Sequence, residues 1–168
     1  MLLFLFGLPG VGKNFVGELL QQHAGFYFYD ADLDGTTAMK QAIAEGRLFT
    51  DAMRDEYYTI VIERIRELQK LHPHIVAAQG LSKNRHREWF HQAFPEMQFC
   101  WVQANESLMV ERLQRRKSSV IITPSYALLV KTAFEEPNFP HYVIENNQGE
   151  QELIPQLEKI YPEFFKIS

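Results

Sequence analysis

Short apolar runs alternate along the chain with longer segments in which apolar residues recur at helical spacing. The apolar runs predict β-strands at residues 2–6, 26–29, 75–78, 99–103 and 142–145. The longer segments predict α-helices at 12–23, 50–71, 84–93, 105–117, 124–134 and 150–161. Strands this short and apolar are typical of a parallel sheet covered on both faces. The alternation therefore predicts a three-layer α/β fold with right-handed crossover connections.

The first strand leads directly into a glycine-rich turn that fits the phosphate-loop pattern GxxxxGK. Glycines let the backbone curl so that successive N–H groups face phosphate oxygens, and the helix that follows adds its positive end. The lysine then reaches the outer phosphates. The alternative is a strand-to-helix turn without a ligand. The predicted ATP-binding residues of this loop are Gly7, Leu8, Pro9, Gly10, Val11, Gly12 and Lys13.

Asn14 occupies the next position, where the phosphate-loop pattern has a serine or threonine whose hydroxyl binds Mg²⁺. An amide oxygen can bind a hard cation, but the side chain is longer and planar. Asn14 is therefore predicted to be a weak metal ligand, or the metal is held elsewhere.

Polar residues also follow the second and third predicted strands, with the sequences Asp30-Ala31-Asp32-Leu33-Asp34 and Gln79-Gly80-Leu81-Ser82-Lys83. Ligands of parallel sheets bind at the carboxyl ends of the strands. One carboxylate can hold Mg²⁺, and a second, two residues on in an extended segment, points the same way and can accept a proton from an attacking hydroxyl. The alternative is a polar turn that closes the strand, or a helix cap.

Basic residues gather at the end of the helix predicted at 105–117, namely Arg112, Arg115, Arg116 and Lys117. Cations are favoured at a helix C-terminus, which is one interpretation. The other is a lid that lays arginine on the transferred phosphate, because the guanidinium fork pairs with phosphate oxygens. The sparsely charged stretch 118–124 that follows is consistent with a hinged lid.

Composition narrows the class of protein further. The 168 residues are 46% apolar and 23% charged, with a formal net charge of −4. These values are typical of a globular protein and do not favour nucleic acid as a partner. Cys100 is the single cysteine, which excludes an internal disulfide. No apolar run approaches the length needed to span a bilayer, so we expect a cytoplasmic protein without a membrane partner.

The chain resembles the gluconate kinase and shikimate kinase group of small P-loop kinases over nearly its whole length. The segments GLPGVGKN, FYDADL, EGRLFTDAMR, RLQRRK and FEEP (134–137) carry the resemblance. It implies one P-loop kinase domain over 1–168, with sheet order 2-3-1-4-5. It also implies a substrate-binding helical region at about 33–60 and a lid at about 115–128. The resemblance is compatible with a monomer or a homodimer.

The resemblance also implies roles for single residues. The loop, with Arg112 and with Arg116 of the lid, would bind ATP, and Asp30 would hold Mg²⁺ through water. Asp32 would bind the acceptor hydroxyl and help to deprotonate it. Arg54 would bind the acid group of the acceptor. Gly80 and Arg87 would face the acceptor.

The chain departs from the family pattern at several positions. Asn14 replaces the metal-binding hydroxyl, and Gly35 stands where gluconate kinases have a histidine. The turn at 79–82 and the lid stretch at 116–119 also differ, and the GGG turn of shikimate kinases is absent. The fold and the nucleotide site therefore transfer better than gluconate as the substrate.

Three functions follow as hypotheses. The first is ATP- and Mg²⁺-dependent phosphorylation of a hydroxyl on a small metabolite, such as the sugar acid gluconate, with Lys13, Asp32 and Arg116 as catalytic residues. The second is a degenerate relative that binds nucleotide without turnover. The third is a nucleoside or nucleotide kinase, in which an aromatic residue stacks on a base. The candidates for that stacking are Phe49, Tyr57 and Trp89.

Overall fold

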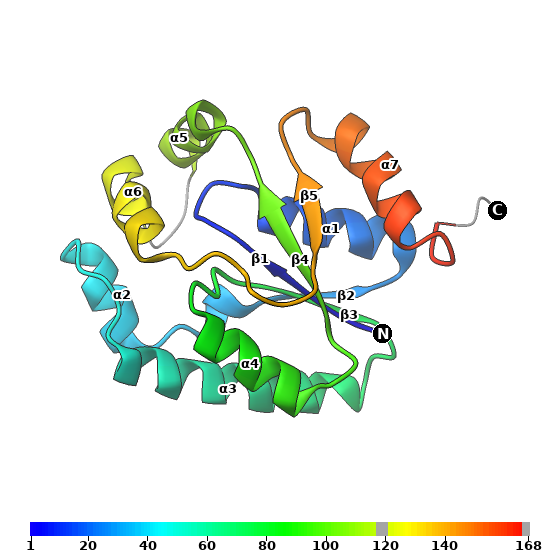
Figure 1. The fold of residues 1–168 in the computed structure, drawn as a ribbon, viewed down its shortest axis with the longest axis horizontal. Coiled ribbons are helices and arrows are strands. Elements are labelled where there is room, and N and C mark those ends of the chain that lie inside the picture. Colours follow the sequence, from blue (N-terminus) through cyan, green and yellow to red (C-terminus); the bar gives the residue numbers. More distant parts are fainter. Residues whose placement is uncertain (117–120, 166–168) are drawn as a thin grey trace.

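A five-stranded parallel sheet forms the centre of the computed structural model, which describes residues 1–116 and 121–165 (Figure 1). Its strands are β1 (Leu2–Phe6), β2 (Tyr27–Asp30), β3 (Ile75–Ala78), β4 (Gln98–Gln103) and β5 (Tyr142–Glu145). Their order is β2-β3-β1-β4-β5, and each neighbouring pair is parallel. The α/β class and the strand order are therefore confirmed.

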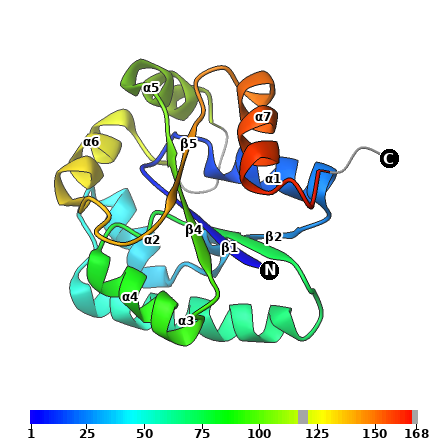
Figure 2. The same ribbon diagram turned by 45° about the vertical axis from the view of Figure 1, so that its right-hand side comes forward.

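Helices cover both faces of the sheet. They are α1 (Lys13–Ala24), α2 (Thr37–Ala44), α3 (Asp51–Gln69), α4 (Asn84–Ala93), α5 (Glu106–Arg115), α6 (Pro124–Ala133) and α7 (Glu150–Ile160). Figures 1 and 2 show α3 and α4 on one face and α1 and α7 on the other. Helices α2, α5 and α6 lie together toward the end of the sheet where β1 runs into α1.

The central strand β1 divides its side chains between two apolar cores. Leu2, Phe4 and Phe6 pack with α3 and α4, whereas Leu3 and Leu5 pack with α1 and α7. All five residues are buried, as expected for a strand covered on both faces. The prediction of full burial is wrong for the edge strands β2 and β5, because each has a neighbour on one side only and keeps exposed residues.

Two local predictions are also wrong. The segment Ala31–Asp34 is a 3₁₀ helix instead of an extended segment, because the Asp30 carboxylate accepts a hydrogen bond from the Asp32 amide at 3.1 Å. Helix α2 was not predicted. It is only eight residues long, and the Thr36 hydroxyl caps it by accepting from the Met39 amide at 3.2 Å.

The predicted lid at 115–128 falls partly on residues 117–120, which lie outside the described residues. Its described part consists of the last residue of α5, Arg116, and the start of α6, which Thr123 caps through the Tyr126 amide. Across the described ranges, no helix is long and apolar enough to cross a membrane.

Candidate nucleotide and acceptor site

The loop between β1 and α1 has the backbone conformation that a phosphate loop requires. Gly10 and Gly12 both have positive φ, at 86° and 89°, a region that side chains other than glycine rarely adopt. A β-carbon on Gly12 would also collide with the Asn146 amide. The glycines are thus needed for the curl of the loop, which aims the start of α1 at the space above the sheet edge.

Lys13, the first residue of α1, folds its side chain back over this loop. Its ammonium donates hydrogen bonds to the carbonyls of Gly7 and Leu8, both at 3.0 Å. Burial lowers the pKa of Lys13 to about 8, an effect that the Asp32 carboxylate opposes and the Arg116 guanidinium reinforces. The ammonium therefore lies in a poorly solvated place between the loop and an acidic partner, which is where a phosphate group would be stabilised.

Asn14 is connected to the acidic cluster instead of standing apart from it. Its amide nitrogen donates to one oxygen of Asp30 at 2.7 Å, and the other oxygen of Asp30 accepts from the Asp32 backbone at 3.1 Å. Within the described part of the chain, no group of three or more His, Cys, Asp or Glu could hold a metal. A carboxylate and an amide oxygen beside a phosphate loop nevertheless fit Mg²⁺, which completes its shell with phosphate oxygens and water.

A cavity of about 630 Å³ opens beside the loop. It brings together most of the predicted site residues. Those in its lining are Pro9, Gly10, Gly12, Lys13, Asn14, Asp30, Asp32, Arg54, Gly80, Arg112 and Arg116. The segments that supply them follow β1, β2 and β3 or belong to α3 and α5, so the shared carboxyl edge of the sheet positions the site.

Asp32 and Arg54 supply opposite charges to this cavity. Desolvation inside the cavity raises the pKa of the Asp32 carboxyl above its ordinary value, although the residue keeps an exposed surface; Lys13 and Arg116 oppose the rise, and Asp30 adds to it. The Arg54 side chain is 8% exposed and has one ion pair, with Asp51 at 3.3 Å. Its guanidinium can therefore still pair with an anionic group in the cavity.

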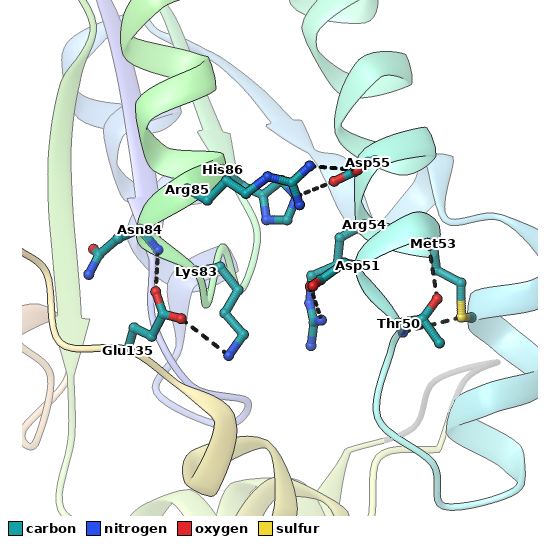
Figure 3. Close-up of polar contacts among 10 residues, drawn as sticks. All are labelled: Thr50, Asp51, Met53, Arg54, Asp55, Lys83, Asn84, Arg85, His86 and Glu135. Atoms are coloured by element: carbon teal, nitrogen blue, oxygen red, sulfur yellow. Dashed lines mark hydrogen bonds and ion pairs between the residues drawn. The ribbon is translucent and has the colours of Figure 1, made fainter.

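Contacts between α3 and α4 hold the first turn of α3, which carries Arg54, in place (Figure 3). Asp55 pairs with Arg85 and with the Nε2 atom of His86, both at 2.7 Å. The His86 bond first and then the Arg85 bond lower the pKa of the Asp55 carboxyl. In the same view the Lys83 ammonium lies near the Glu135 carboxylate, at 3.4 Å. The Asp55 contacts join the first turn of α3 to α4, and Arg54 of that turn lines the cavity. The Lys83–Glu135 pair instead joins the start of α4 to the segment after α6.

Arg112 lines the cavity, and its guanidinium also makes hydrogen bonds that hold the fold together. It donates to the carbonyls of Val11, at 3.3 Å, and Asn146, at 2.8 Å. It thereby ties α5 to the phosphate loop and to the segment after β5.

Three predicted ATP-binding residues, Gly7, Leu8 and Val11, do not line the cavity, and Val11 belongs to an apolar core.

The prediction that Arg87 faces the acceptor is wrong. The side chain is buried and lies outside the lining of the cavity. Its Nε donates to the Leu81 carbonyl at 2.9 Å, and one Nη donates to the Asn84 side chain and the Glu135 carbonyl, both at 2.7 Å. Arg87 thus connects the turn after β3 to the chain segment that follows α6.

Two aromatic rings enclose the same guanidinium, which lies 4.9 Å from the ring centroids of Phe6 and Phe134. Burial lowers the pKa of Arg87 to about 10. Arg87→Met is expected to lower the free energy of unfolding by about 3 kcal/mol, because it keeps the bulk but leaves buried carbonyls unpaired. Urea denaturation measures this, with Arg66→Met as the control, because Arg66 is exposed and pairs with Glu63 on the same helix surface. A loss below about 0.5 kcal/mol would contradict the structural assignment.

Sequence reasoning did not identify Tyr58 as part of the site. It named Tyr57 as a candidate for stacking on a base and Gln79 as a polar residue after the third strand, without joining them into one wall of the cavity. Tyr57 and Tyr58 have helical spacing typical of core residues, and they are buried, yet both also line the cavity. Gln79 is buried beside them, where its carbonyl oxygen accepts from the Tyr58 hydroxyl at 2.8 Å and the Leu81 amide at 2.6 Å. The polar character of Gln79 at the end of an apolar strand was the signal that could have identified it.

Together, the strand order, the phosphate loop at the end of β1 and the acidic pair at the end of β2 define a P-loop nucleotide-binding fold. The chain belongs to the AAA domain family, whose sequence model matches residues 3–127. The resemblance to the gluconate kinase and shikimate kinase group is confirmed by individual relatives as well.

Two shikimate kinases are among the relatives of this chain. The one from Streptomyces coelicolor is 37% identical over 79 residues, which cover 47% of this chain and 45% of that protein. The one from Caulobacter vibrioides is 27% identical over 142 residues, 82% of this chain and 68% of that protein. The chain thus matches less than half the length of the first relative.

A solved structure of a gluconokinase from Sinorhizobium meliloti has the same fold. The TM-score is 0.77 at 20% sequence identity, and the superposition covers 98% of this chain and 95% of that one. At this identity the likeness establishes the fold, and the activity has to be argued from the site.

Proposed function

We propose that the protein transfers the γ-phosphoryl group of ATP to a hydroxyl group of a small anionic metabolite. One observation carries the proposal. The ammonium of Lys13 at the phosphate loop and the carboxylate of Asp32 face one cavity, and each changes the pKa of the other. Phosphoryl transfer needs bound phosphates, neutralised charge and an oriented hydroxyl, and little covalent help from the protein.

The loop and its neighbours would bind the nucleotide. Backbone N–H groups of the loop would hold the phosphates, and Lys13 would exchange its bonds to the loop carbonyls for phosphate oxygens. Arg112 and Arg116 would pair with further nucleotide oxygens. Asp30, through water, and weakly Asn14 would hold Mg²⁺, which when bound neutralises charge on the transferred group.

Asp32 would act on the acceptor. Its carboxylate accepts the proton of the acceptor hydroxyl while that oxygen bonds to the γ-phosphorus and the bond to the departing ADP breaks. The raised pKa of Asp32 makes it a better base than an ordinary carboxylate. Arg54 would pair with the acid group of the acceptor, beside the backbone of Gly80. Gluconate is one anion that carries both a hydroxyl and an acid group.

Acceptor-dependent release of ADP tests this function. Purified protein is incubated with ATP, Mg²⁺ and single hydroxy acids, gluconate and shikimate included, and ADP is measured by a coupled assay. We expect at least one acid to raise ADP release well above the rate without acceptor, and mass spectrometry to find the phosphorylated acid. ADP release that no acid increases would contradict the proposal.

The second candidate is a protein that binds nucleotide without turnover. The hydrogen bond from Asn14 to Asp30 favours this candidate, because the bond occupies a carboxylate that would otherwise face the metal. If the protein is a kinase, ATP binding depends on Mg²⁺ in the unchanged protein, and Asn14→Ser lowers the Mg²⁺ concentration for half-maximal binding about three- to tenfold. Calorimetry measures this, with Asn138→Ser as an exposed control outside the cavity. Binding that becomes Mg²⁺-dependent only in Asn14→Ser would support the degenerate protein.

A nucleoside kinase gains less support from the site. Phe49 and Tyr57 do line the cavity, but Trp89 does not. The Arg85 guanidinium lies over the Trp89 ring, and the His86 ring meets it edge-on. A neutral nucleoside would also give buried Arg54 no anionic group beyond Asp51, whereas a nucleotide acceptor would offer its phosphate. Competition by nucleosides, and not by hydroxy acids, would favour this third candidate.

A further inference from the structure

The part of the cavity away from the phosphate loop is walled by apolar side chains from two segments that face each other. One segment runs from α2 to the start of α3, and the other is α6 with the residues before it. Figures 1 and 2 both show α2 and α6 next to each other. The side chains of this apolar wall are Met39, Ile43, Leu48, Phe49, Ile122 and Val130.

Three tyrosines also line the cavity, and the hydroxyl of each donates its proton to another group of the protein. Tyr57 donates to the Ala31 carbonyl at 2.6 Å, and Tyr58 donates to Gln79 at 2.8 Å. Tyr126 of α6 donates to the Arg47 carbonyl at 3.2 Å. The tyrosines therefore contribute rings and no free donor. A ligand hydroxyl against them would lose its bonds to water without full replacement.

The charged groups left for an acceptor are few. Asp32 can bind one hydroxyl. Arg54 is buried, pairs among the described residues with Asp51, and can bind one anionic group. Lys40 also lines the cavity but is exposed on α2.

Arg112 of α5 bonds to the phosphate loop, where the nucleotide phosphates would take it, and Arg115 is exposed and pairs with Glu111. One reacting hydroxyl and one acid group thus have charged partners. Ser82 and Gln79 add uncharged polar groups near the turn after β3, and hydroxyls beyond their reach meet the apolar wall.

We infer that the acceptor is a hydroxy acid with a largely apolar carbon frame, and not a polyhydroxylated sugar acid. This rests on the proposed function and names its substrate class. The reacting hydroxyl lies at Asp32, the acid group pairs with Arg54, and the frame between and beyond them packs on the apolar wall and the tyrosine rings. Burial of apolar surface then contributes to affinity.

Matched pairs of acids separate frame polarity from every other property. Gluconate and 6-hydroxyhexanoate have the same carbon chain, carboxylate and terminal hydroxyl, and differ by four hydroxyls. Shikimate and 3-hydroxycyclohex-1-ene-1-carboxylate form a comparable ring pair, which differs by two hydroxyls. Binding is measured by calorimetry on protein loaded with Mg²⁺ and a non-hydrolysable ATP analogue, so that it does not depend on turnover. Binding of the analogue alone, measured first, reports separately on the nucleotide site of the proposed function.

We expect the less hydroxylated acid of at least one pair to bind at least about tenfold more tightly than its partner. Val130→Asn should reduce that ratio at least about threefold, because its amide offers hydrogen bonds to the extra hydroxyls. Leu128→Asn is the control, since Leu128 lies on the same helix, is exposed and does not line the cavity. It should leave the ratio unchanged.

Three results would overturn the inference. The first is equal or tighter binding of gluconate and shikimate than of their less hydroxylated partners. The second is a ratio that Leu128→Asn changes as much as Val130→Asn does. The third is a nucleotide-loaded protein that binds none of the four acids, which would exclude a hydroxy acid of this size while leaving the nucleotide site intact.

Discussion

Lys13→Ala is expected to lower acceptor phosphorylation on the order of 10³-fold and to abolish ATP binding at micromolar concentrations. The ammonium is the cation at the phosphate loop, and charge-stabilising donors of this kind contribute about 10²- to 10³-fold each. Coupled ADP release with the acid identified in the panel measures turnover, and calorimetry measures binding. Lys70→Ala, which removes an exposed lysine paired with Glu67, is the control.

The stability of Lys13→Ala shows whether its loss of activity comes from the missing ammonium or from unfolding. The pKa of Lys13 is lowered in the folded protein, so the folded state disfavours the charged form at neutral pH. Removing the ammonium relieves that cost while two hydrogen bonds to loop carbonyls are lost. The free energy of unfolding should therefore change by no more than about 1 kcal/mol. Activity within tenfold of the unchanged protein would contradict the role given to Lys13.

Asp32→Asn is expected to lower kcat/KM by about 10²- to 10⁴-fold, because an amide cannot accept the proton of the acceptor hydroxyl. The pH profile carries a second signature. Desolvation inside the cavity raises the pKa of Asp32, so kcat/KM of the unchanged protein should fall as the pH drops through a value above the ordinary carboxyl range. The residual activity of Asp32→Asn should lack that acid limb.

Asp34→Asn is the matched control, because Asp34 belongs to the same 3₁₀ helix but does not line the cavity. Its carboxylate accepts from the Tyr29 hydroxyl at 2.6 Å and pairs with Arg64. This variant should lose stability more than activity and should keep the acid limb. An Asp32→Asn protein within threefold of full activity would mean that another group accepts the proton.

Local patterns account for the parts of the fold that the sequence predicted well. The GxxxxGK turn follows a fully apolar strand, and both signals lie within a dozen residues, so β1, the loop and α1 were predictable together. The meeting of Lys13 with Asp32 was predictable because the ends of parallel strands share one edge. This prediction did not depend on the segment after β2 being extended, and that segment is in fact a 3₁₀ helix.

Positions that depend on distant packing were not predictable. Arg87 lies in the first turn of α4 with nothing nearby to indicate burial, and its place is set by Phe6 and Phe134, which are far away in the sequence. Val130 is a similar case. The sequence shows an apolar residue on a predicted helix, but it does not show that this side of α6 faces a cavity. The chemistry at the acceptor end was therefore hidden in residues that a sequence pattern assigns to the core.

Calorimetric titration of ATP, with and without Mg²⁺, tests the central claim most directly. The account predicts binding in the micromolar range that Mg²⁺ strengthens, that Lys13→Ala abolishes and that Lys70→Ala leaves intact. Absence of binding at millimolar ATP, weaker than about −4 kcal/mol, would contradict it. The phosphate loop would then be a structural turn only, and the proposed kinase function would fall with it.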